Sequence, residues 1–157
     1  MKLIKEINNS YGNCLARKCG DTGCRIKLDR INSKHIIISG TKYQRYFKYY
    51  DKLCDFILFD CNQNDKYRLA VIEVKGGKLD IFDIRGLHKQ LQNGAKIANR
   101  LSTSYEVQAF MPVTVKKKRI DVMARKTLLM NKKYWVRFRE FFEIIEIFKH
   151  NRSLKFN

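Results

Sequence analysis

Arg68-Leu-Ala-Val-Ile-Glu-Val-Lys-Gly-Gly77 is an apolar run that ends in a carboxylate and an ammonium two residues apart. Alternate residues of a β-strand share a face, so Glu73 and Lys75 would point the same way as some of the apolar side chains. Burying an unpaired charge is costly, and two charges on one face of an apolar strand therefore indicate a functional role. The following Gly76-Gly77 lets the backbone turn or lie close to a ligand.

A second apolar run of strand length, Cys54-Asp-Phe-Ile-Leu-Phe59, lies upstream of the first. The connector between the two runs, residues 60–66, is polar and rich in turn-forming residues. We therefore predict an antiparallel hairpin that turns about Asn64. Its predicted register pairs Phe59 with Leu69, Ile57 with Val71, and Asp55 with Glu73.

Directly opposed residues on one face of a sheet have Cβ atoms roughly 4.5–5.5 Å apart. At that distance the carboxylates of Asp55 and Glu73 repel each other unless a cation lies between them. Lys75 would supply some of the positive charge, and a divalent metal would supply more. The alternative is a surface hairpin in which the three charged side chains only pair with one another.

The order of these residues resembles the PD-(D/E)XK nuclease superfamily, in the branch of restriction endonucleases and archaeal Holliday-junction resolvases. The resemblance rests on Asp55, on Glu73-Val-Lys75 after an apolar hairpin, and on a following helix that carries Gln90, and it covers residues 41–110. It implies a restriction-endonuclease-like core and a Mg²⁺-dependent endonuclease that hydrolyses phosphodiester bonds in DNA, with Mn²⁺ as a substitute. Asp55 and Glu73 would then bind the metal together with the backbone carbonyl of Val74. Lys75 would position water or stabilise charge.

The residue types suit that chemistry. Mg²⁺ prefers oxygen ligands and usually takes only one or two carboxylates, with water and phosphate completing its shell. A bound metal lowers the pKa of water and stabilises the charge on phosphate during in-line displacement. A lysine beside the metal can hold the attacking water or stabilise the pentacovalent phosphate. If the helix after Lys75 packs against the hairpin, Gln90 would orient water or phosphate; a solvated glutamine is the alternative.

The net charge predicts a polyanionic partner. The 157 residues include 33 Lys and Arg against 15 Asp and Glu, which gives a formal charge of +18. We expect DNA, with RNA left open as the alternative, and no membrane partner. The phosphate contacts would be sequence-independent. The candidate nucleic-acid-binding residues are Lys42, Arg45, Lys48, Lys78, Lys89, Lys116, Lys117 and Lys118.

The composition, 45% hydrophobic and 31% charged, is that of a globular protein, and the length favours one domain over residues 1–157. No apolar run approaches the length of a membrane span and no secretory signal pattern opens the chain, so we expect a cytoplasmic or otherwise intracellular protein. One small domain has a single site and would nick one strand. We therefore expect a homodimer, which would supply two sites.

The periodicities predict an α/β fold with a mixed central sheet and helices on both sides. Pro112 should end its strand or lie at an edge, and the strand at 105–111 should run parallel to the Glu73 strand. The segment 139–148 fits a helix by spacing but is rich in strand formers, and we leave it open. The predicted strands are 25–31, 35–39, 54–59, 68–75, 105–111 and 134–138, and the predicted helices are 41–51, 80–101 and 120–128.

Five cysteines are an odd number, and we expect reduced thiols. Cys14, Cys19 and Cys24 could bind a structural zinc with His35, although their spacing is not that of a tight zinc knuckle. Members of the resembled superfamily often carry an extra acidic residue on an early helix. Glu6 is the nearest candidate for that position.

Overall fold

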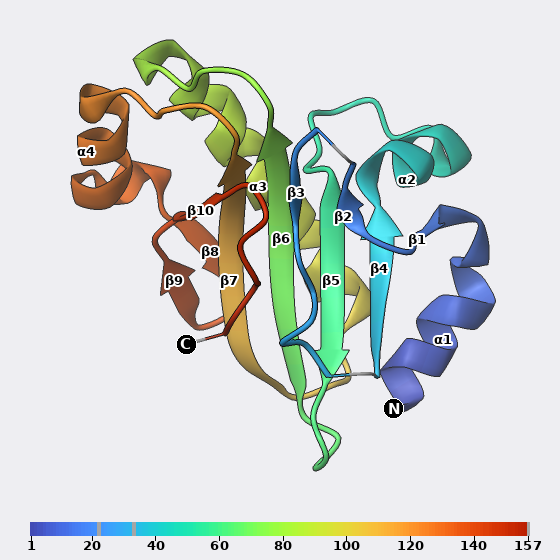
Figure 1. Ribbon diagram of the computed structural model, residues 1–157. Coiled ribbons are helices and arrows are strands. Elements are labelled where there is room, and N and C mark those ends of the chain that lie inside the picture. Colours follow the sequence, from blue (N-terminus) through green and yellow to red (C-terminus); the bar gives the residue numbers. More distant parts are fainter. Residues whose placement is uncertain (22, 33, 157) are drawn as a thin grey trace.

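The computed structural model describes residues 1–21, 23–32 and 34–156. Within them the chain forms a six-stranded mixed sheet in the order β1-β4-β5-β6-β7-β10 (Figure 1). The pairs β1–β4, β4–β5 and β5–β6 are antiparallel, and the pairs β6–β7 and β7–β10 are parallel. The strands are β1 Leu15–Ala16, β4 His35–Ser39, β5 Phe56–Cys61, β6 Tyr67–Lys75, β7 Val107–Lys116 and β10 Glu146–Lys149.

Two small ribbons and the helices complete the described part of the chain. The ribbons pair β2 (Cys19–Gly20) with β3 (Arg25–Ile26), and β8 (Val136–Phe138) with β9 (Phe141–Glu143). No helix within the described residues has the length and apolarity that crossing a membrane requires. The helices are α1 Lys2–Ser10, α2 Gly40–Phe47, α3 Ile84–Leu101 and α4 Val122–Met130, and the 3₁₀ turns are η1 Gly12–Cys14, η2 Ile81–Asp83 and η3 Lys132–Tyr134.

The β5–β6 hairpin has the predicted register. Phe59 pairs with Leu69 and Ile57 with Val71, and the ladder ends at Phe56 and Ile72. In a hairpin the type and length of the connecting turn fix the register, and the polar connector after β5 therefore sets these pairs. Both faces of β6 are covered, because its central residues are buried without interruption.

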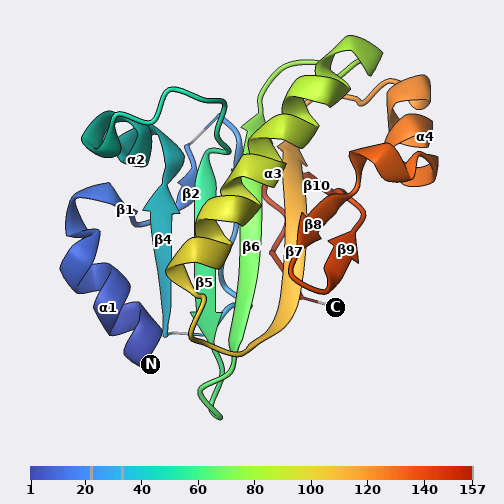
Figure 2. The same ribbon diagram turned by 180° about the vertical axis from the view of Figure 1, so that it is seen from behind.

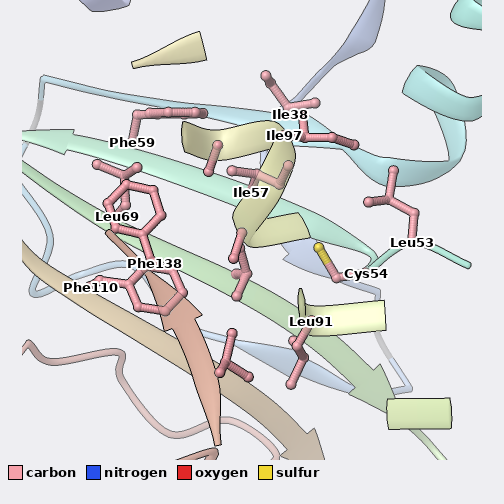
Figure 3. Packing of buried hydrophobic residues seen from close by; sticks show 14 of the residues in the cluster. Ile38, Leu53, Cys54, Ile57, Phe59, Leu69, Leu91, Ile97, Phe110 and Phe138 are labelled. Carbon is pink, nitrogen blue, oxygen red and sulfur yellow. The ribbon is translucent and has the colours of Figure 1, made fainter. Parts of the chain in front are cut away.

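The two faces of the sheet are covered differently. On one face α3 crosses the strands, and side chains of α1 and α3 join the same buried cluster (Figure 2). Figure 3 shows part of that cluster, including Leu91 of α3 beside Cys54 and the strands. The other face is covered by non-helical segments, which supply Ile26, Ile31 and Leu154 to a second cluster. The expectation of helices on both sides was therefore wrong, because these segments bury enough apolar surface to replace a helix.

The crossover from β6 to β7 follows from local signals. Asp80 accepts a hydrogen bond from the Phe82 amide, and Asp83 accepts one from the Asp80 amide, which is a reciprocal capping box. The helix α3 then buries Leu87 and Leu91 at helical spacing. It returns the chain to β7, which is parallel to β6 as predicted.

Pro112 lies inside β7 and does not end it, since β7 continues to Lys116. The edge alternative fits better: β10 pairs with β7 only from Val113 onward, so that side of β7 is unpaired at Pro112. The missing amide proton thus removes no hydrogen bond to β10.

Element boundaries differ from prediction in several places. The strand predicted at 25–31 is confined to β3, and the segment 139–148 forms β9 and β10 in place of a helix. The helix α2 begins one residue before Thr41 because Ser39 caps it, accepting a hydrogen bond from the Lys42 amide. Lys48, with φ of 51°, ends it.

Candidate functional site

Asp55 and Glu73 meet where the β5–β6 ladder ends. The Asp55 amide donates to Glu73 Oε2 at 3.0 Å, and the Val74 amide donates to Asp55 Oδ2 at 2.8 Å. In each of these hydrogen bonds a side-chain carboxylate oxygen is the acceptor, where a backbone carbonyl would be the acceptor inside the ladder. This exchange continues the register by one pair and fixes the two acids side by side, as the sequence predicted.

Lys75 and Gln90 complete the group. Lys75 Nζ lies 3.3 Å from Glu73 Oε1 and 3.3 Å from Gln90 Oε1. Gln90 comes from α3, and its backbone carbonyl accepts a hydrogen bond of 3.1 Å from the Cys54 amide. The four side chains predicted for catalysis are therefore brought together from the residue before β5, from β6 and from α3, and Gln90 is hydrogen-bonded within the site.

Two glycines let helices approach the segment that carries Asp55. A Cβ on Gly40 would overlap the Cys54 carbonyl oxygen, and a Cβ on Gly94 would overlap Cys54 Sγ. The Gly40 amide also donates to the Asp55 carbonyl at 2.7 Å. We did not predict either contact from the sequence. The available signal was a glycine inside a helical pattern, which often marks close packing.

Burial dominates the electrostatics of the acid pair. Glu73 is only 4% exposed. Its pKa rises from 4.5 to about 7, first because burial penalises the charged form and second because Asp55 is nearby, while Lys75 opposes the rise. Burial also raises the pKa of Asp55, and the two carboxyl groups hydrogen-bond to each other. Burial and the neighbouring carboxylate thus favour the protonated form of Glu73.

The donor set fits a hard divalent cation that keeps water ligands. Asp55 and Glu73 supply carboxylate oxygens, and a strand residue directs its N–H and C=O to the same side, so the Val74 carbonyl faces the strand of Asp55. Mg²⁺ needs no more protein ligands than this. Within the described ranges no group of three or more His, Cys, Asp or Glu side chains could hold a metal. The site therefore does not suit an all-protein zinc centre.

The adjacent strand β7 contributes two polar residues that face the same site. Thr114 pairs in register with Glu73, and Lys116 pairs with Lys75. The Thr114 hydroxyl is buried and has no hydrogen-bond partner among the described atoms. Lys116, predicted as a phosphate contact, is instead 4% exposed and donates to the Gly77 carbonyl, and burial lowers its pKa. It anchors the glycine loop beside the site.

The other predicted phosphate contacts lie on the surface. Figure 1 shows α2 and the end of β7 on opposite sides of the same end of the sheet, with the end of β6 between them. Lys42 donates to the Leu15 carbonyl at 2.8 Å, and Lys89 pairs with Asp51 at 3.2 Å. The exposed members of the set are Lys42, Arg45, Lys48, Lys78, Lys89, Lys117 and Lys118.

Glu6 and the cysteines lie apart from the site. Glu6 hydrogen-bonds to Tyr105, whose ring packs against Tyr67 at the start of β6, so Glu6 is at the opposite end of that strand from Glu73. The cysteines are free thiols. Cys14 belongs to the α3-side cluster, whereas Cys19 and Cys24 belong to the cluster on the other face. The three thiols do not converge on a metal.

Comparison of the chain with protein-family models, curated proteins and solved structures found no significant match.

Proposed function

We propose that this protein is a Mg²⁺-dependent endonuclease of the PD-(D/E)XK type that hydrolyses phosphodiester bonds in DNA. The observation that carries the proposal is the acid pair itself: the buried Glu73 and the partly buried Asp55 lie in contact, burial raises the pKa of each, and one ammonium, Lys75, lies beside them. Buried acids with insufficient positive charge form a site that a divalent cation would stabilise.

Each residue of the site would have its own role in the hydrolysis. Asp55, Glu73 and the Val74 carbonyl would hold Mg²⁺ or Mn²⁺, which when bound activates water and neutralises charge on phosphate. Lys75 Nζ, held between Glu73 Oε1 and Gln90 Oε1, is in position to donate to water or to a phosphate oxygen. Gln90 orients Lys75 because its side-chain oxygen accepts from the ammonium. A cation binds ionised carboxylates, so a proton on Glu73 must leave when the cation binds.

The partner and assembly follow from charge and chemistry. A net charge of +18 suits a nucleic acid, DNA in our proposal with RNA as the alternative. A restriction-endonuclease-like core and a homodimer with two sites belong to the same proposal. Free buried thiols are consistent with an intracellular location.

A non-catalytic nucleic-acid-binding protein is the second candidate. It is favoured by the hydrogen bonds inside the site, because each carboxylate already accepts a backbone amide and Glu73 already pairs with Lys75. In that case the group would be a structural network that joins the strand ends. Divalent-metal binding separates the two candidates.

Cleavage of supercoiled plasmid and of branched DNA, with Mg²⁺, Mn²⁺ or EDTA, tests the proposal. Glu73→Gln keeps the shape of the side chain and an acceptor for the Asp55 amide, and Lys75→Met keeps the aliphatic stem. We expect each to lower the cleavage rate by about 10²–10³-fold while DNA binding persists. Lys5→Met, which removes an exposed lysine of α1, is the matched control and should cut like the wild type.

Two results would contradict the proposal. If the wild type binds DNA but cuts none of the substrates with either metal, the non-catalytic candidate is correct. If Glu73→Gln and Lys75→Met cut as fast as Lys5→Met, the cleavage arises elsewhere in the molecule.

A further inference from the structure

A basic groove lies on the far side of β7 from the acid pair. Two adjoining hollows of about 450 and 460 Å³ follow β10 and α4 and share Arg125, Ile147 and Lys149 in their walls. No Asp or Glu lines either hollow. We define the β10 groove by six exposed cations of its lining: Lys117, Lys118, Arg119, Arg125, Lys149 and Arg152.

None of these six cations forms a salt bridge with an acid in the described part of the chain. Five salt bridges occur among the described residues, and none involves a cation of the groove. Like charges gathered without counter-charges repel one another, which costs stability. Such a gathering is therefore expected where an external polyanion supplies the missing charge.

The wall that carries Lys149 and Arg152 is held in place by backbone hydrogen bonds. The His150 amide donates to the Lys116 carbonyl at 2.8 Å, and the Leu154 amide donates to the Lys27 carbonyl at 2.9 Å. The segment is therefore a fixed part of the sheet face. Because the backbone is already ordered, a ligand would pay little entropy to bind these cations.

His150 adds a neutral donor to the groove lining. Its Nδ1 accepts a hydrogen bond of 2.9 Å from the Arg25 amide. The neutral ring therefore carries its proton on Nε2, from which it can donate to a phosphate oxygen. His150 lines the same hollow as Lys117 and Lys118.

The groove is continuous with the candidate site. Lys116 lines the groove and pairs in register with Lys75, and neighbouring strands lie about 4.8 Å apart. Lys116 also holds the Gly77 carbonyl, and Leu79 bridges to Ile120 in the groove wall. The loop after the catalytic strand and the groove wall thus form one surface.

We propose that the β10 groove binds the sugar–phosphate backbone of a nucleic acid and directs it to the acid pair. A nucleic-acid strand presents one phosphate about every 3.4 Å, which suits a row of cations along a concave surface. A single strand follows a concave row of cations more closely than a flat anionic membrane would. Binding in the groove stands by itself, whereas delivery to the acid pair rests on the proposed nuclease function.

Binding without cleavage tests the groove separately. Labelled duplex DNA, single-stranded DNA and duplex RNA are titrated in EDTA over a range of salt concentrations. The groove variant combines Lys118→Gln, Arg125→Gln and Lys149→Gln. The control variant combines Lys2→Gln, Lys5→Gln and Lys34→Gln, three exposed lysines far from the groove, so both variants lose three charges from +18 and carry +15.

For duplex DNA, we expect the groove variant to reduce the slope of log K against log salt by about 3 and to lower affinity by about 100-fold at low salt. The control variant should change affinity by no more than about threefold. Circular dichroism and thermal melting verify that both variants fold. For the wild type, the relative affinities of the three probes show which nucleic acid the groove prefers.

The groove proposal is overturned by any of three results. These are equal losses in both variants, wild-type affinity in the groove variant, or loss of binding to phosphatidylserine vesicles without loss of nucleic-acid binding. If the groove variant loses affinity but the wild type never cuts with Mg²⁺ or Mn²⁺, only the nuclease function and delivery to the acid pair fail. If the wild type cuts, the groove variant should raise KM and leave kcat nearly unchanged.

Discussion

The β5–β6 hairpin buries charge at both of its ends, and the two ends are built differently. Near the turn, the fully buried Asp60 accepts hydrogen bonds from the Asn32 amide and side chain and from the Arg68 guanidinium. At the open end, Asp55 and Glu73 share one ammonium. Asp60 and Arg68 also lie on the opposite face of the sheet, where the ring of Phe156 packs under the guanidinium at 4.9 Å.

The difference between the two ends separates a structural ion pair from a candidate site. Asp60 has one positive partner and four donor contacts, so its charge is neutralised within the protein. Asp55 and Glu73 are two acids beside one base, Lys75; burial raises the pKa of each, and the nearby Asp55 raises that of Glu73 further. A buried charge by itself therefore does not mark a candidate site in this protein; the excess of acids over bases is what distinguishes the open end from Asp60.

The largest effect is expected at the turn end of the hairpin, which we call the balanced end because Arg68 neutralises Asp60 there. Arg68→Met removes the partner of Asp60 and leaves a buried carboxylate, which should lower the free energy of unfolding by about 3–5 kcal/mol. Urea unfolding at pH 7 measures it. The double variant Asp60→Leu/Arg68→Met should recover most of the loss, because no charge is then left buried. If Arg68→Met lowers the free energy of unfolding by less than about 1 kcal/mol, the pair does not differ from an exposed ion pair, and the contrast between the two ends of the hairpin is wrong.

The second effect, at the open end, has the opposite sign. In EDTA, Glu73 has a pKa of about 7 in the folded protein and an ordinary value of 4.5, so between these pH values the folded state binds the extra proton. Stability therefore falls as pH rises from 4.5 to 7, by about 3 kcal/mol for this group. Glu73→Gln should abolish that loss and be more stable than the wild type at pH 8.

Unfolding curves of both proteins at several pH values check this prediction. Arg68→Lys is a suitable control, since it leaves the open end unchanged and should keep the pH dependence of the wild type. Adding Mg²⁺ at pH 8 should stabilise the wild type and not Glu73→Gln, because a ligand stabilises only the state that binds it. A wild type less stable than Glu73→Gln by the same amount at pH 4.5 and at pH 8 would be incompatible with this origin.

A smaller effect tests how closely α3 approaches the open end. Gly→Ala inside a helix normally gains up to about 1 kcal/mol. At Gly94 the new methyl group would overlap Cys54 Sγ and lie 3.2 Å from Val71 Cγ1. We therefore expect Gly94→Ala to lower stability by about 1–2 kcal/mol. Thermal melting measures the change, and Gly94→Ala/Cys54→Ala should relieve most of it; stabilisation by Gly94→Ala alone would show that the helix has room there.

The smallest effect is expected for an exposed ion pair near the open end. Lys89 and Asp51 are 3.2 Å apart, but both side chains are about half exposed. Solvent and salt screen such a pair, so Lys89→Met should leave the unfolding curve unchanged within experimental error. A clear loss of stability would mean that exposed pairs matter here as much as the buried pair of Asp60.

Much of the open end was predictable because its signals are local. The apolar runs 54–59 and 68–75 and the polar connector between them predict a hairpin, and a hairpin with a defined register places Asp55 beside Glu73. The capping residues Asp80 and Asp83 predict the start of the following helix. The pairing of β6 with β7 follows from the crossover rule.

The balanced end was not predicted, although Asp60 and Arg68 are on the same two strands. The sequence interpretation placed Asp60 in the connector, and only the longer ladder of the structure moves it into β5 opposite Arg68. The amide and side chain of Asn32 come from a segment whose position depends on the packing of the second sheet face. The secondary-structure propensities of single residues do not predict contacts between segments that are distant in the chain.

The sequence by itself determined the hairpin, its register and the meeting of Asp55, Glu73 and Lys75, because these depend on strand geometry over fewer than twenty-five residues. Only the tertiary structure decided which lysines are available to a ligand. It buried Lys116 against Gly77 and assembled the β10 groove from residues 117–125 and 149–152. The physical reason is that burial and charge gathering are set by contacts between segments distant in the chain, whereas strand alternation is set by neighbouring residues.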